Sequence, residues 1–61
     1  MLSDEQIKQW MAEHLDEYYD AKTGLYDIGQ LVLDAADNFN EWDDDGNPPE
    51  RYYKLVEEVW I

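Results

Sequence analysis

The sequence predicts an all-α fold, a compact three-helix bundle formed by one domain over residues 1–61. In three segments, apolar residues recur at the 3.6-residue spacing of an amphipathic helix. Each segment opens with residues that favour a helix N-terminus, and short connections join one segment to the next. No segment alternates apolar and polar residues as a half-buried strand would. Together these observations favour helices packed around one core.

The first helix is predicted over residues 4–22. Ser3 and Gln6 have the spacing of a capping box, in which each side chain accepts a hydrogen bond from the backbone N–H group of the other residue. Gly24 favours the left-handed backbone conformation that often ends a helix. The predicted core residues of this helix are Ile7, Trp10, Met11, Leu15 and Tyr18.

The second helix is predicted over residues 27–40, where Asp27 and Gln30 repeat the capping-box spacing. Two alanines in the middle of its apolar stripe leave room for a neighbouring helix to approach closely. The predicted core residues of this helix are Ile28, Leu31, Val32, Ala35 and Phe39.

The third helix is predicted over residues 48–60. Asn47 is a favourable N-cap residue, and Pro48 and Pro49 occupy first-turn positions at which proline is tolerated. Glu50 completes a third capping box. The apolar stripe contains Tyr52, Tyr53, Val56, Val59 and Trp60, of which the last three are predicted core residues.

The strongest functional signal is the charge. The chain has 16 Asp and Glu residues against four Lys and Arg residues, a formal net charge of −12. Like charges on a small compact domain repel one another and lower its stability. We interpret the charge as a surface used to bind a partner that is itself basic, and most basic surfaces hold nucleic acid. The alternative is that the charge serves solubility alone.

The composition also argues against several classes of function. No apolar run approaches the ~20 residues of a membrane-spanning helix, and the acidic N-terminus lacks the basic region of a signal peptide. Four dispersed cationic side chains cannot neutralise a track of phosphates, so direct binding of DNA or RNA is not expected. The absence of cysteine is compatible with a reducing compartment. We expect a cytoplasmic protein that is monomeric before it binds its partner.

The acidic residues fall into groups that predict a protein-binding surface. Five, with Glu5 among them, share the face of the first predicted helix opposite its core stripe. Two lie on the outer face of the second helix, and four fall within five residues of the following connection. The predicted protein-binding residues are Glu13, Asp16, Glu17, Asp20, Asp34, Asp37, Glu41, Trp42, Asp43, Asp44 and Asp45. Their carboxylates can take the place of nucleic-acid phosphates.

Trp42 lies within the acidic connection and outside the predicted core stripes. An exposed Trp among carboxylates is typical of an interface anchor and can stack on a partner's arginine. Alternatively, the side chain folds back over the small core as a lid. The sequence leaves both interpretations open.

No arrangement typical of an active site or a cofactor site is present in the sequence. His14 is the single histidine, and there is neither a cysteine nor a glycine-rich phosphate loop. Residues 41–52 place three acidic residues at ligand positions of an EF-hand loop, but Tyr52 stands where the bidentate Glu belongs. We expect no enzymatic activity and no cofactor, and we assign no metal ligands; the sequence leaves open whether residues 41–45 bind a divalent cation weakly.

In composition and architecture the whole chain resembles the small inhibitors encoded by phages and mobile elements, among them anti-CRISPR proteins and other nucleic-acid mimics. The shared features are a short, acidic, cysteine-free helical chain with surface aromatic residues. The resemblance implies a stoichiometric inhibitor that binds a basic nucleic-acid-binding protein, such as a CRISPR effector subunit. If the chain is encoded by a phage, it would act in the host cytosol.

A second resemblance is to the small acidic adaptor of bacterial iron–sulfur cluster assembly. The matching pieces are Leu33-Asp34 through Phe39, Asp43-Asp44-Asp45 and Val59-Trp60-Ile61. This resemblance implies an adaptor that docks on a basic protein surface. The N-terminal third of the chain departs from the pattern, and residues 40–42 are an insertion relative to it.

Overall fold

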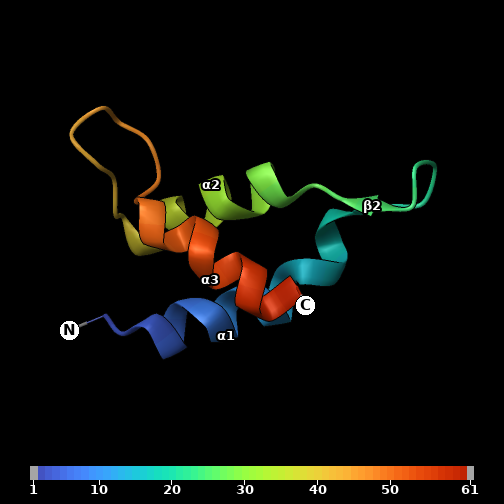
Figure 1. The fold of residues 1–61 in the computed structure, drawn as a ribbon, viewed down its shortest axis with the longest axis horizontal. Helices are drawn as coiled ribbons and strands as arrows, with labels where there is room; N and C mark the ends of the chain where they lie inside the picture. Colours follow the sequence, from blue (N-terminus) through green and yellow to red (C-terminus); the bar gives the residue numbers. More distant parts are fainter. Residues whose placement is uncertain (1, 61) are drawn as a thin grey trace.

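The computed structural model describes residues 2–60, which contain three α-helices in mutual contact, one short 3₁₀ helix and a small β-hairpin (Figure 1). In chain order the elements are α1 (Asp4–His14), the 3₁₀ helix η1 (Leu15–Tyr18), β1 (Tyr19–Asp20), β2 (Leu25–Tyr26), α2 (Ile28–Phe39) and α3 (Glu50–Trp60). The predicted three-helix bundle is confirmed, whereas the hairpin shows that a purely α-helical fold was the wrong prediction. Met1 and Ile61, the ends of the predicted domain, lie outside the described residues.

Of the three predicted capping boxes, the one at Ser3 is complete, and the one at Asp27 has only its N-cap hydrogen bond. Ser3 Oγ accepts from the N–H of Gln6 at 3.3 Å, and Gln6 Oε1 accepts from the N–H of Ser3 at 2.8 Å. At the start of α2, the carboxylate of Asp27 accepts from the N–H of Gln30 at 3.2 Å. The third helix begins at Glu50 rather than at residue 48, so the two prolines precede the helix.

The first helix is shorter than predicted because the chain turns into a hairpin. α1 ends at His14, and β1 and β2 pair antiparallel, with Tyr19 opposite Tyr26. The Gly24 N–H donates to the Asp20 carbonyl at 2.7 Å, and Gly24 has a φ of +73°. The glycine that was interpreted as a helix stop therefore belongs to the hairpin turn, where a left-handed backbone is also required.

The helical prediction for residues 15–22 was therefore wrong. Leu15 and Tyr18 are three residues apart, a spacing that a 3₁₀ turn satisfies as well as an α-helix does. Both side chains are half-buried and pack against the core from this shorter element. The apolar spacing was correct, but it did not distinguish between the two kinds of helix.

The core lies where the three helices meet. Its buried residues are Ile7, Met11, Leu31, Val32, Ala35, Ala36, Tyr52, Leu55 and Val56. The predicted core residues Trp10, Leu15, Tyr18, Ile28, Phe39 and Val59 are partly buried and pack against this cluster. Trp60 is 51% exposed, so its prediction as a core residue was wrong. The buried residues of α3 are Tyr52, Leu55 and Val56, of which Leu55 was not predicted.

Candidate functional site

The predicted acidic face of the first helix does not exist as one helical face, because α1 ends at His14. Glu13 lies on α1, Asp16 and Glu17 lie in η1, and Asp20 lies in β1. All four side chains are exposed. These four residues, here the hairpin-side acids, belong to three consecutive elements rather than to one rigid helix.

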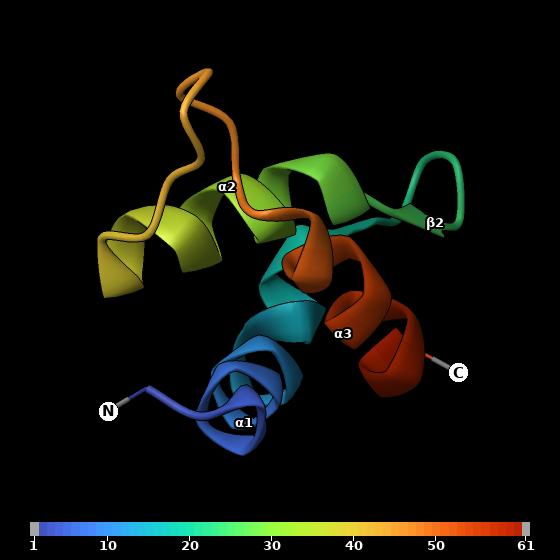
Figure 2. The same ribbon diagram turned by 60° about the vertical axis from the view of Figure 1, so that its left-hand side comes forward.

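Asp34 and Asp37 lie on α2, and the connection between α2 and α3, which carries Glu41 and Asp43 to Asp45, stands away from the helices (Figures 1 and 2). In Figure 1 it lies at the end of the molecule opposite the tip of the hairpin. The longest extent of the molecule is 35 Å. The predicted binding residues are therefore distributed along the molecule and do not form a single patch.

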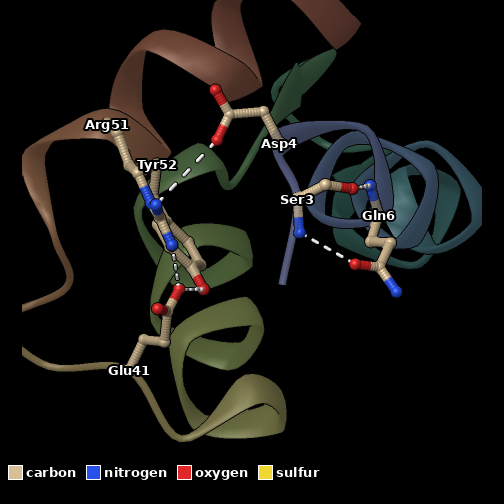
Figure 3. Close-up of polar contacts among 6 residues, drawn as sticks. All are labelled: Ser3, Asp4, Gln6, Glu41, Arg51 and Tyr52. Atoms are coloured by element: carbon tan, nitrogen blue, oxygen red, sulfur yellow. Dashed lines mark hydrogen bonds and ion pairs between the residues drawn. The ribbon is translucent and has the colours of Figure 1, made fainter. Parts of the chain in front are cut away.

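Glu41 has a structural role that the sequence did not indicate. Its Oε1 accepts a hydrogen bond from the Tyr52 hydroxyl at 2.7 Å and pairs with the Arg51 guanidinium (Figure 3). Arg51 Nη1 also lies 4.0 Å from Asp4 Oδ1 at the start of α1. Glu41 therefore connects the end of α2 to α3, and Arg51 extends the connection to α1.

The hydrogen bond from Tyr52, together with the neighbouring Arg51, holds the pKa of the Glu41 carboxyl below its ordinary value of 4.5. Burial and the same bond raise the pKa of the Tyr52 hydroxyl. At neutral pH, Glu41 is thus a charged acceptor for a buried neutral hydroxyl. Tyr52 is 0% exposed, so its hydroxyl would lose its hydrogen-bond partner if Glu41 were removed.

This network makes the stability of the fold depend on pH. The pKa of Glu41 is lower in the folded state than in the unfolded state. The charge of Glu41 therefore contributes fully to the free energy of unfolding above the unfolded-state pKa, and this contribution is lost as the pH falls through the folded-state pKa. We expect the stability advantage of the wild type over Glu41→Gln to shrink between about pH 6 and about pH 3. Urea unfolding at each pH measures it, and a constant difference would contradict this role of the charge.

Asp34 is also engaged within the fold. Its carboxylate accepts hydrogen bonds from the Tyr18 hydroxyl and, at 2.8 Å, from Gln30 Nε2. Burial, followed by the bond to Asp34, raises the pKa of Tyr18 to about 12. Asp34 thus joins α2 to η1, and it is half-buried rather than exposed.

Asp43 shapes the acidic connection. Its Oδ1 accepts from the N–H groups of Asp45 and Asn47, at 2.9 and 2.8 Å. Gly46 follows with a φ of +80°, a conformation that favours glycine. Two carboxylates of this connection, those of Asp44 and Asp45, have no hydrogen-bond or ion-pair partner within residues 2–60. These two residues are here called the loop acids.

Trp42 stands beside these acids and is 41% exposed. It is not among the partly buried hydrophobic side chains that pack against the core. This position leaves part of the indole accessible to a partner.

Few of the carboxylates are neutralised by cations. Lys8 Nζ pairs with Glu5 Oε1 at 3.1 Å, and Arg51 pairs with Glu41. Within residues 2–60, seven carboxylates have neither a hydrogen bond nor an ion pair, and all seven side chains are exposed. They belong to Asp16, Asp37, Asp44, Asp45, Glu50, Glu57 and Glu58. The surface therefore keeps most of its negative charge.

Such a surface predicts that salt stabilises the fold. Ions shorten the range of repulsion to about 10 Å at 0.1 M, so the exposed carboxylates repel one another less in the folded state. We expect the melting temperature to rise between low salt and about 0.3 M sodium chloride. A flat melting temperature over this range would show that self-repulsion does not oppose this fold.

The part of the chain that the structure describes has no pocket and no group of three or more His, Cys, Asp or Glu side chains placed to hold a metal ion. None of the described helices combines the length and the apolar character needed to cross a membrane. Comparison with protein families, with curated proteins and with solved structures found no match.

Proposed function

We propose that this chain is a non-enzymatic inhibitor that binds a basic nucleic-acid-binding protein and blocks it by presenting carboxylates in place of phosphates. The observation that carries the proposal is the excess of exposed carboxylates that no cation neutralises, on a chain with a net charge of −12. A CRISPR effector subunit in the cytoplasm is one target that fits the resemblance to anti-CRISPR proteins.

The rigidity of the elements supports this proposal. Asp37 is on a helix, Asp16 is in a 3₁₀ turn, and the loop acids lie in the connection whose backbone Asp43 binds. A partner that binds these groups does not have to order a flexible acidic tail, so less conformational entropy is lost on binding.

The length of the molecule also supports the proposal. Acidic residues occur toward both ends of its 35 Å long axis, and one turn of duplex DNA spans about 34–36 Å. A basic groove that follows a duplex for one turn would meet carboxylates at both ends of this protein. Charge complementarity of this kind acts mainly on the rate of association.

The two acidic ends can be tested against a matched control. We expect the double variant Asp44→Lys and Asp45→Lys, and likewise Asp16→Lys with Glu17→Lys, to slow association with the captured partner about tenfold. The control is Glu50→Lys with Glu58→Lys on α3, which changes the net charge by the same amount. Stopped-flow or surface-binding kinetics measures the rates, and equal slowing by all three would show that only net charge matters.

A further inference from the structure

The hairpin carries two tyrosines whose rings lie against each other. Tyr19 of β1 is directly opposite Tyr26 of β2 in the antiparallel ladder, which places both side chains on one face of the hairpin. Their ring centroids are 5.1 Å apart, and the ring planes are inclined at 56°. Tyr19 is 50% exposed, and Tyr26 is half-buried. Neither is among the partly buried side chains that pack against the core, so this tyrosine pair forms an aromatic surface of its own.

The turn of the hairpin is held by Asp20. Its Oδ1 accepts from the N–H of Lys22 at 2.9 Å, and its carbonyl oxygen accepts from the N–H of Gly24 at 2.7 Å. The Tyr19 hydroxyl lies over this turn, because it would be 4.0 Å from a Cβ added at Gly24. The tyrosine pair is therefore positioned before a partner arrives, and less conformational entropy is lost when a group binds to it.

Acidic residues lie on either side of Tyr19 along the chain. Asp16 and Glu17 lie in η1 just before it, and Asp20 follows it directly. All three side chains are exposed. Because consecutive Cα atoms are 3.8 Å apart, the Cα atoms of these residues lie within about 11 Å of that of Tyr19. The one cationic residue of the hairpin sequence is Lys22, so negative charge is in excess around the exposed ring.

An aromatic ring beside carboxylates favours the guanidinium group of arginine. A planar guanidinium stacks on the negative face of the ring while its N–H groups bind a carboxylate. The ammonium group of lysine is a compact, strongly hydrated charge that does not stack in this way. The fold contains one such arrangement already, because the Arg51 guanidinium lies 5.8 Å from the centroid of the Tyr52 ring and binds the carboxylate of Glu41.

We propose that the tyrosine pair is a docking surface for an arginine side chain of the partner, with the guanidinium stacked on the exposed Tyr19 ring and bound by a neighbouring carboxylate. The proposal rests on the proposed function in one respect, that the partner is basic. A second copy of this chain is disfavoured as the occupant, because two chains with a net charge of −12 repel each other. The single arginine of the sequence, Arg51, is also already paired with Glu41.

The test compares two synthetic peptides of equal length and equal charge, in which serine alternates with arginine in one and with lysine in the other. Attraction by net charge is the same for both. We expect the wild-type chain to bind the arginine peptide about two- to fivefold more tightly, since stacking on an exposed ring adds to the attraction. Calorimetric titration at low salt measures both affinities. Equal affinities for the two peptides would overturn the proposal.

Substitutions at Tyr19 separate stacking on the ring from binding by carboxylates alone. Tyr19→Leu keeps a large apolar side chain in the strand but has no ring, so it should lose most of the preference for arginine, whereas Tyr19→Phe should keep it. The matched control is Tyr53→Leu on α3, at a tyrosine 44% exposed, which should leave the preference unchanged. Circular dichroism confirms that each variant is folded. An equal loss in Tyr19→Leu and Tyr53→Leu would show that the tyrosine pair has no special role.

The outcome does not depend on nucleic-acid mimicry, because the peptide assay contains no nucleic acid. If the captured partner keeps its nucleic acid while Tyr19 still selects the arginine peptide, mimicry fails and the docking surface stands. If the partner loses its nucleic acid while both peptides bind equally, the docking surface fails and mimicry stands.

Discussion

Leu31→Ala is expected to unfold most of the protein at ambient temperature. Leu31 is 0% exposed in the middle of the core, and truncation of a buried leucine costs about 2–5 kcal/mol. A 61-residue domain that has no disulfide has only a few kcal/mol of stability to lose. Thermal and urea unfolding followed by far-UV circular dichroism measures the change.

The matched control is Leu33→Ala, two residues later on the same helix. Leu33 is 42% exposed, so its truncation should change the free energy of unfolding by no more than about 0.5 kcal/mol. If the two variants were equally destabilised, the packing of α2 described above would be wrong.

Glu41→Ala is the second substitution with a large expected effect. It leaves the buried hydroxyl of Tyr52 and the guanidinium of Arg51 without their shared acceptor. An unsatisfied buried polar group costs about 1–3 kcal/mol. Glu41→Gln keeps an oxygen acceptor for Tyr52, so its loss should be smaller. Urea unfolding at neutral pH measures both.

Asp44→Ala is the control for Glu41→Ala, because it removes another carboxylate from the same acidic connection. Asp44 has no bonded partner among the described residues, and its removal lowers the repulsion between like charges. Its free energy of unfolding should be unchanged or slightly higher. A loss as large as that of Glu41→Ala would mean that the two carboxylates do not differ in role.

The starts of the helices could be predicted because their signals are local. Ser3 with Gln6, and Asp27 with Gln30, are three residues apart, and their hydrogen bonds depend on nothing outside one helical turn. The end of the first helix could not be predicted in this way. It depends on the pairing of Tyr19 with Tyr26, and the intervening Gly24 suits a hairpin turn and a helix stop equally well.

The candidate site was predictable as a charge excess but not residue by residue. Glu41 and Asp34 look like any other acid in the sequence, and their partners Tyr52 and Tyr18 are 11 and 16 residues away. Such contacts arise only when the helices pack. No local pattern around Arg51 indicated that it would join α1 to α3.

The central claim is that this protein and nucleic acid compete for one basic surface. The most direct test captures the partner on the immobilised chain and then measures binding of the partner to its own DNA or RNA with increasing amounts of this protein. The account predicts stoichiometric displacement, which is weaker for the variant with Asp44→Lys and Asp45→Lys than for the one with Glu50→Lys and Glu58→Lys. A partner that binds nucleic acid equally well in the presence of this protein would contradict mimicry and favour an adaptor role.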